Sequence, residues 1–381
     1  MGLDLSAVAA IDQQGYPLLR PEIAASLPYA AIFTESHDSE VIRLQVPKTL
    51  AYRRGMRTIA TLLGCEATAE AIAAQRSELG WDALGAKCLA AARLEALLLD
   101  DSFLPEAALP LGDHQSLVPT HRVLQVERLA EALLPQVTQL EVFLEWFRSE
   151  LDPPPAGVVA FKSSALQQGG IVEGAEIDQA AVGFDEVQYS MATHEPEEAP
   201  MNRARLDPHL NSFLLAQALE IAAKYSLPVQ LQAGLGDVTQ APQLANPLSL
   251  RPLLETRAYR RVSLVLVTPH PFLQAASSLA AAYPQVYIEY GHTASVSAAG
   301  AGRALKTLLE RCPTTKIVYG SGARFLPDAF YLAATAGRQA LAQVLEDAVA
   351  DGDLTGQDAE GIAIAILRGN AQRLYRVTSV S

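Results

Sequence analysis

Short apolar runs that end in polar or small residues constrain the fold of this chain more than any other feature. Four of them are Ala7–Ile11, Val158–Ser163, Pro228–Gln232 and Lys316–Ser321. A short apolar run bounded by polar residues and turns is typical of a buried strand in a parallel sheet. Polar residues that follow such strands form the active-site rim of α/β barrels. The runs therefore predict a barrel whose strand ends carry the functional groups.

Further runs and helical segments complete this pattern. Apolar residues at three- and four-residue spacing predict helices between the strands. The additional predicted strands are Leu94–Asp101, His121–Val126, Val262–Val267 and Val286–His292. The predicted helices are Thr49–Cys65 with a stop at Gly64, a helix that starts at Thr68, Glu127–Phe147, Pro208–Tyr225 and one that begins at Ala299–Arg303. This alternation of strands and helices predicts an α/β fold class.

One segment is too long to be a plain connection between strands. Residues 21–89 separate the first two predicted strands, and loops of this length are uncommon inside a barrel. We interpret them as a helical insertion over the barrel mouth, within a single domain of residues 1–381. The polar residues Gly183–Arg205 are predicted to be a loop that places His194 and, with the next helix start, His209 toward solvent.

Composition excludes several classes of function. Half of the residues are hydrophobic, which is enough for a large core, and the formal net charge of −13 argues against nucleic acid or an anionic membrane as a partner. The three cysteines, Cys65, Cys88 and Cys312, are too few and too widely spaced for a disulfide framework or a metal motif. No secretory pattern and no apolar segment of membrane-spanning length is present, so a cytoplasmic location is expected.

Taken in order, the strand-end sequences resemble the amidohydrolase superfamily over nearly the whole chain. This resemblance implies an α/β fold, a (β/α)8 TIM barrel with a helical insertion after the first strand. The similarity is strongest to the amidohydrolase-related branch that includes the N-terminal domain of fungal and plant glutamine-synthetase fusion proteins. In that branch the first strand reads Asp-Asn-His-x-His-Pro-Leu-Leu, the fifth ends in His-x-Gly-x-Gly-Asp and the eighth in Tyr-Gly-Ser-Asp. The matching stretches here are Ile11–Leu19, Leu231–Asp237 and Tyr319–Gly322.

The metal ligands that the resemblance implies are substituted in this chain. The two first-strand histidine positions hold Gln14 and Tyr16, the fifth-strand histidine position holds Gln232, the sixth-strand position is best matched by Thr268, and the eighth-strand aspartate position holds Gly322. Neutral amide oxygens are poor ligands for zinc, and glycine offers no side chain at all. We therefore expect neither a catalytic metal nor another cofactor.

Lys162, at the end of the fourth predicted strand, is the retained family position. In the family such a lysine is a carboxylated metal bridge or a polar active-site group. Without metal ligands, a desolvated amine at this place could act as a base or as an imine-forming nucleophile. The alternative is a structural ion pair with Glu289 or Asp100.

Other polar residues at the predicted strand ends are candidates for catalysis and binding. Glu289 with His292 could form a general acid–base pair, and His270 follows the sixth strand. Arg324 or Lys162 could hold a substrate carboxylate. The proposed catalytic residues are Lys162, Glu289, His270 and His292; the proposed binding residues are Gln14, Tyr16, Gln232, Thr268 and Arg324. Each histidine could instead be structural.

Adjacent carboxylates close the second predicted strand. Asp100 and Asp101 could serve as a general acid and base. Successive strand residues face opposite ways, however, so at most one of the two points inward.

Two functions fit these observations. The first is a degenerate, metal-independent amidohydrolase-like enzyme that acts on a small polar amide or carboxylate by hydrolysis, transfer or lyase chemistry at a C–N or C–C bond. The second is a non-catalytic binding or partner protein that kept the barrel and lost the chemistry. The expected partner is a small polar molecule, and the resemblance also suggests a homodimer.

Overall fold

Eight parallel strands, paired in chain order, form a nearly closed barrel with helices around it. The computed structural model describes residues 2–193, 206–234, 244–291 and 298–377. The predicted (β/α)8 TIM barrel is thereby confirmed. The strands are β1 (Ala10–Gly15), β2 (Leu94–Asp100), β3 (Thr120–Gln125), β4 (Val158–Ser163), β5 (Val229–Gln232), β6 (Leu264–Val267), β7 (Val286–Tyr290) and β8 (Ile317–Tyr319).

Helices and short helical turns occupy every connection between the strands. Those before β4 are α1 (Pro21–Ala24), η1 (Tyr29–Phe33), η2 (Val41–Gln45), η3 (Val46–Lys48), α2 (Leu50–Leu63), α3 (Ala69–Leu79), α4 (Trp81–Ala92), α5 (Leu111–Gln115), α6 (Val126–Leu133), η4 (Leu134–Gln136) and α7 (Leu140–Leu151). Those after β4 are α8 (Ala165–Gln168), α9 (Ile177–Thr193), α10 (Pro208–Tyr225), η6 (Pro247–Leu250), α11 (Arg251–Glu255), η7 (Arg257–Tyr259), α12 (Leu273–Ala282), α14 (Ala298–Leu309), η8 (Thr314–Lys316), α15 (Pro327–Ala350), α16 (Gly356–Ile364), η9 (Ala365–Gly369) and α17 (Asn370–Tyr375).

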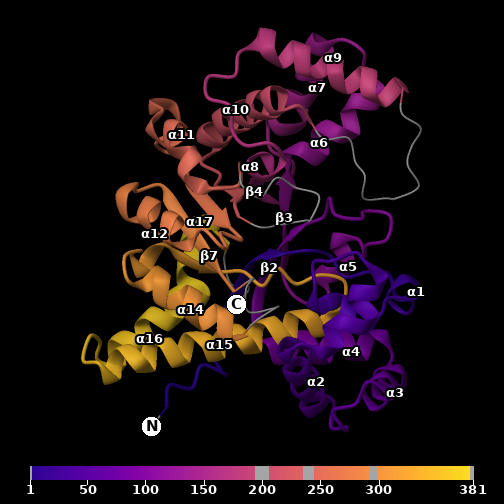
Figure 1. The fold of residues 1–381 in the computed structure, drawn as a ribbon, viewed down its shortest axis with the longest axis vertical. Helices are drawn as coiled ribbons and strands as arrows, with labels where there is room; N and C mark the ends of the chain where they lie inside the picture. Colours follow the sequence, from indigo (N-terminus) through magenta and orange to yellow (C-terminus); the bar gives the residue numbers. More distant parts are fainter. Residues whose placement is uncertain (1, 194–205, 235–243, 292–297, 378–381) are drawn as a thin grey trace. The chain divides into compact units, whose positions relative to one another are not determined.

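The chain divides into two compact units. The first comprises Met1–Arg122 with Ile288–Ser381, and the second comprises Val123–Tyr287. In the first unit α2, α3 and α4 gather beside α15, and in the second α9, α7 and α6 gather around α10 (Figure 1). The expectation of one domain over residues 1–381 remains a prediction from the sequence.

The first strand differs from its predicted bounds. It was expected at Ala7–Ile11, but it begins at Ala10 and continues through the polar cluster to Gly15. All six of its residues are buried. Polar side chains are tolerated in a buried strand where hydrogen bonds replace those lost to water, and Asp12 and Gln13 receive such bonds from Ser321 and Tyr375.

Two helical predictions in the second unit also need correction. The helix expected over Glu127–Phe147 is interrupted at Pro135, because proline has no backbone N–H for a helix interior. Gly183–Thr193, expected to be loop, belongs to helix α9. Gln188 of α9 donates to the carbonyls of Leu134 and Val137, both at 2.9 Å. These bonds hold α9 against the segment that interrupts the expected helix over Glu127–Phe147.

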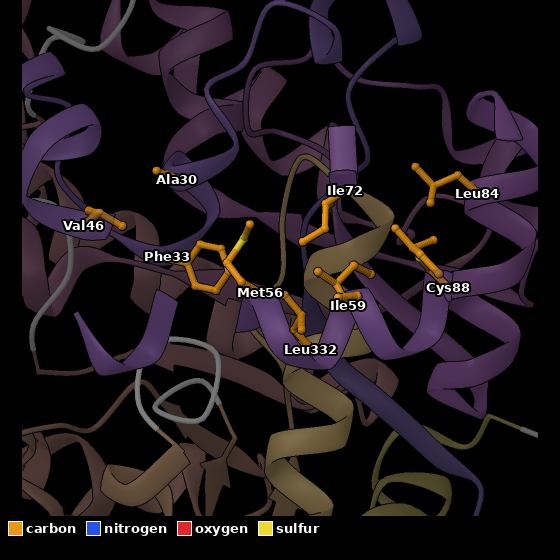
Figure 2. Packing of buried hydrophobic residues seen from close by; sticks show 11 residues of the cluster. Ala30, Phe33, Val46, Met56, Ile59, Ile72, Leu84, Cys88 and Leu332 are labelled. Carbon is orange, nitrogen blue, oxygen red and sulfur yellow. The ribbon is translucent and has the colours of Figure 1, made fainter. Parts of the chain in front are cut away.

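The segment between β1 and β2 is helical, with its first helix at Pro21 and its last ending at Ala92. The predicted helix limits at α2 hold: Thr49 accepts a bond from the Tyr52 amide, and Gly64 ends the helix with a φ of 73°. Figure 2 shows Phe33, Met56 and Ile59 of this segment packed with Leu332 of α15. The helical segment therefore shares a hydrophobic core with a barrel helix.

Truncation inside this shared core should destabilise the protein strongly. Ile59 is fully buried, and we expect Ile59→Ala to lower the free energy of unfolding by about 2–5 kcal/mol, measured by denaturant titration. Leu50, on the same helix and 67% exposed, provides the control: Leu50→Ala should change it by less than about 0.5 kcal/mol. Equal losses for the two variants would contradict the described packing.

Candidate functional site

The residues proposed for the site fall into both compact units, and each group is described on its own. The first unit contains Gln14, Tyr16, Glu289 and Arg324, and the second contains Lys162, Gln232, Thr268 and His270. His292 lies outside the described residues.

In the first unit, three polar side chains converge on Gly320, directly after β8. A Cβ atom added at Gly320 would lie 2.8 Å from Gln13 Nε2, 2.9 Å from Glu289 Cγ and 3.0 Å from Gln14 Cβ. The first two distances are shorter than real Cβ contacts and the third is tighter than most of them, so a side chain at this position would displace its neighbours. The glycine thus allows Gln14 of β1 and Glu289 of β7 to lie close together.

Gln14 is the most unusual member of this group. Its side chain is almost fully buried, at 2% exposure, yet neither Oε1 nor Nε2 has a hydrogen-bond partner among the described residues. Its backbone is fixed, because its N–H donates to Asp12 at 3.2 Å and its carbonyl accepts from the Gly322 amide at 2.8 Å. The main chain therefore fixes the point from which the side chain leaves the backbone, while the donor and the acceptor of its amide are both left unused by the described protein groups.

Asp12 anchors β1 to the segment after β8. Its carboxylate accepts bonds from the backbone amide of Ser321 at 2.8 Å and from the Ser321 hydroxyl. Burial raises the pKa of Asp12 to about 6, although the bonds from Ser321 act in the opposite direction. The sequence analysis did not include Asp12 among the site residues; a carboxylate at the end of an apolar run was the available signal.

Tyr16 and Arg324 contact neighbouring loops in the first unit. The Tyr16 ring lies 5.4 Å from the Phe103 ring. Arg324 Nη1 lies 2.9 Å from a carboxylate oxygen of Glu35, and Nη2 donates to the carbonyl of Thr34 at 2.9 Å. Arg324, proposed as a carboxylate-binding residue, thus holds a carboxylate of the helical segment between β1 and β2.

In the second unit, Lys162 is buried near the end of β4, paired in register with Gln230 of β5. Its neighbour Ser163 donates a bond of 2.5 Å to Glu127, a fully buried carboxylate. Burial raises the pKa of Glu127, and the bond from Ser163 opposes that shift. Glu127 was not predicted as a site residue, because in the sequence it reads as the first turn of a helix.

The exits of β5 and β6 are also close in the second unit. Gln232 pairs in register with Val267, and Thr268 follows in the left-handed backbone region with a φ of 53°. A Cβ atom at Gly234 would lie 2.6 Å from the Thr268 carbonyl oxygen and 2.2 Å from that of His270, so only glycine fits. His270 itself is exposed.

The adjacent carboxylates at the end of β2 have different environments. Asp100 is buried and accepts bonds of 3.1 and 2.5 Å from the amide and hydroxyl of Ser102. Asp101 forms an ion pair with Arg122 at 2.9 Å. Burial raises the pKa of Asp101, and Arg122 opposes that shift.

The donor set at the expected ligand positions does not fit a catalytic metal ion. Gln14 and Gln232 offer amides, Tyr16 and Thr268 offer hydroxyls, and Gly322 offers no side chain. Within the described part of the chain, no three His, Cys, Asp or Glu side chains are grouped so that they could hold a metal ion. Zinc sites require imidazole, thiolate or carboxylate ligands, so this set lacks the necessary chemistry.

The amidohydrolase family model matches residues 187–377, half of the sequence. The chain belongs to the amidohydrolase family. This membership agrees with the resemblance seen in the strand-end motifs. None of the described helices combines the length and the apolar composition that a membrane span requires.

Individual relatives cover most of the chain. Protein fluG of Emericella nidulans is 29% identical over 96% of this chain, which spans 45% of the length of fluG. A candidate metal-dependent hydrolase from Lactobacillus casei superposes with a TM-score of 0.85 at 22% identity, covering 99% of this chain and 98% of that one. A uronate isomerase from Thermotoga maritima has a TM-score of 0.63 at 14% identity, over 96% and 94% of the two chains. The two structures support the fold.

The buried carboxylate of Asp12 should make stability depend on pH. In the unfolded chain Asp12 ionises near 3.8, whereas burial raises its pKa to about 6 in the folded protein. Between these pH values the folded state keeps a proton that the unfolded state has lost. The contribution of Asp12 to the free energy of unfolding therefore falls as pH rises, and at pH 7 it is about 3 kcal/mol lower than below pH 3.8. We expect the free energy of unfolding of Asp12→Asn, relative to wild type, to increase from pH 4 to pH 7 in denaturant titrations.

Ser321→Ala tests the same linkage in the opposite direction. The Ser321 hydroxyl lowers the pKa of Asp12 in the folded protein, so its removal should extend the pH-dependent window to higher pH, while its lower limit, set by the unfolded chain, stays the same. Stability profiles of wild type and Asp12→Asn that run parallel from pH 4 to pH 7 would contradict the assignment.

Proposed function

We propose that this protein is a metal-independent enzyme of the amidohydrolase family that acts on a small polar amide or carboxylate. The reaction would be hydrolysis, transfer or lyase chemistry at a C–N or C–C bond. The observation that carries the proposal is the buried amide of Gln14, unbonded to any described residue and close to Glu289.

An amide in this state is suited to a specific kind of ligand. A buried donor or acceptor without a partner costs about 1–3 kcal/mol, so such groups are kept where they serve a purpose. A substrate amide or a protonated carboxyl group presents one acceptor and one donor side by side. Either would satisfy Oε1 and Nε2 of Gln14 together, whereas an apolar ligand would leave both groups unpaired.

The chemistry of the other candidate side chains suggests a role for each of them. Glu289 would give or take the proton at the substrate group that Gln14 binds. Lys162 would act as a second base or as a nucleophile, and His270 and His292 stay proposed acid–base groups. Tyr16, Gln232 and Thr268 would contact the polar substrate, and Arg324 would hold its carboxylate.

The family relationship does not identify the reaction. The solved structures similar to this chain include a candidate hydrolase and a uronate isomerase, and one fold commonly supports several reactions. The bond cleaved must therefore be decided by assay. The cytoplasmic location and the homodimer also stay predictions from the sequence.

A non-catalytic binding protein is the second candidate function. The ion pair of Arg324 with Glu35 favours it, because a guanidinium proposed to bind substrate is engaged within the protein. Such a protein would bind a small polar molecule through Gln14 but would not convert it.

Replacing Gln14 should separate stability from binding. We expect Gln14→Leu to raise the free energy of unfolding by about 1–3 kcal/mol, because an apolar side chain of similar size removes two unpaired polar groups. The same variant should lose binding of acetamide, measured by ligand-observed NMR. Thermal and denaturant unfolding provide the stability readout.

Gln13→Leu is the matched control for this experiment. Gln13 is the same residue type one position earlier, but its Oε1 accepts a 2.5 Å bond from the Tyr375 hydroxyl. Its replacement should lower stability, because the buried hydroxyl would lose its acceptor. A loss of stability in Gln14→Leu equal to that in Gln13→Leu would show that the Gln14 amide is structural.

Metal removal tests the proposed independence from metal. We expect purified, untagged protein to hold less than one metal ion per chain by mass spectrometry, and dialysis against a chelator to leave its unfolding temperature and its acetamide binding unchanged. About one tightly bound zinc ion per chain, with loss of acetamide binding after chelation, would overturn the proposal.

A panel of small amides and carboxylates, followed by proton NMR for conversion, then distinguishes the enzyme from the binding protein.

A further inference from the structure

Three aromatic rings form a row at the carboxyl ends of strands in the first unit. Tyr16 follows β1, Phe103 follows β2, and Phe325 lies in the segment after β8. The ring centroids of Tyr16 and Phe103 are 5.4 Å apart, and those of Phe103 and Phe325 are 5.9 Å apart. All three residues are only partly buried. The row therefore presents aromatic surface where barrel enzymes place their binding groups.

The backbone around these rings is strained. Phe325 has a φ of 72°, and Leu104, next to Phe103, has a φ of 50°. Bulky residues rarely adopt this left-handed region, and such strain is found preferentially at binding and catalytic sites. Hydrogen bonds maintain both conformations: the Phe325 carbonyl accepts from the Leu19 amide at 2.9 Å, and the Leu104 carbonyl accepts from Ala107 at 2.9 Å.

Arg324 lies at one end of the aromatic row. Its guanidinium is 5.1 Å from the centroid of the Phe325 ring. The same guanidinium holds the carboxylate of Glu35, whose side chain is 39% exposed. A small cavity of about 20 Å³, enough for about one water molecule, adjoins Glu35, Gly322 and Arg324. Arg324 thus binds a carboxylate beside an aromatic surface, and the present carboxylate is accessible to competition.

The row is connected to the buried amide through the main chain. The Gly322 amide donates to the Gln14 carbonyl at 2.8 Å, and the Tyr16 amide donates to the Ala323 carbonyl at 2.9 Å. Gln14, Tyr16 and Arg324 therefore belong to one hydrogen-bonded pair of segments. The main chain thereby places the amide-bearing, aromatic and guanidinium residues at one strand end.

We propose that this site takes an aromatic carboxylate that also bears an amide. Its ring lies on the row of Tyr16, Phe103 and Phe325. Its carboxylate replaces that of Glu35 on Arg324, so Glu35 occupies the anion position until a ligand arrives. This proposal specifies the substrate class of the proposed function. It rests on that function only in assuming that Gln14 binds the reacting amide of the ligand.

Four small probes separate the ring from the polar groups: benzoate, acetate, benzamide and acetamide. Their dissociation constants are measured by ligand-observed NMR on the wild-type protein. Because stacking and burial of a ring add to the polar contacts, benzoate should bind at least about tenfold more tightly than acetate, and benzamide than acetamide. Equal affinity within both pairs would overturn the aromatic subsite.

Single substitutions then test which residues cause the higher affinity for ligands that carry a ring. Phe103→Ala should reduce the preference for the ring by about three- to tenfold, and Phe103→Leu, which keeps apolar volume, should reduce it less.

Glu35→Gln should strengthen the binding of benzoate and acetate about three- to tenfold and leave the binding of benzamide unchanged, because it removes a competing negative charge. Tyr189→Ala, at an aromatic residue 73% exposed in the second unit, and Glu40→Gln are the controls expected to change nothing.

The outcomes distinguish this inference from the proposed function. If Gln14→Leu abolishes binding of both amides while the ring adds no affinity, the aromatic subsite is wrong and the function proposed for Gln14 stands. If the ring preference depends on Phe103 while Gln14→Leu changes no affinity, the subsite stands and that function is wrong. Benzoate binding unchanged in Glu35→Gln would contradict the anion exchange at Arg324.

Discussion

The hydrogen-bonded connection between the first strand and the segment after the last strand is the constraint on which the candidate site depends. Asp12 accepts from Ser321, the Gln14 carbonyl accepts from Gly322, and the Tyr16 amide donates to Ala323. These bonds fix the direction in which each side chain leaves the backbone. Gln14, Tyr16, Arg324 and Phe325 consequently occupy one strand end, although more than three hundred residues separate the two segments in the sequence.

This connection has an energetic cost that falls on buried polar groups. Burial raises the pKa of Asp12 to about 6, so its ionised form opposes folding near neutral pH. Gln14 adds an amide whose donor and acceptor find no partner among the described residues. A barrel optimised only for stability would hold apolar side chains at these positions. Retention of both groups is the physical reason for the proposal that this strand end binds a ligand.

The helical segment between β1 and β2 contributes to the same strand end. It packs against α15 through the cluster that contains Ile59 and Leu332, and its Glu35 holds Arg324. Its apolar spacing, the Thr49 cap and the Gly64 stop were readable in the sequence because they are local signals. The ion pair was not, since nothing near Glu35 in the sequence indicates that its partner lies directly after the eighth strand. The same limit explains α9, whose helix is held by Gln188 bonding to carbonyls about fifty residues earlier.

The sequence by itself determined the (β/α)8 barrel and the approximate position of its eight strands, because apolar runs and strand-end motifs are properties of the chain alone. Only the tertiary structure decided that β1 continues through Asp12 and Gln14, that Gly320 leaves room for Gln14 beside Glu289, and that Arg324 holds Glu35. Those outcomes depend on contacts between distant segments. The partner available to a polar side chain, and hence its protonation and its freedom to bind a ligand, is set by the packing of the strands.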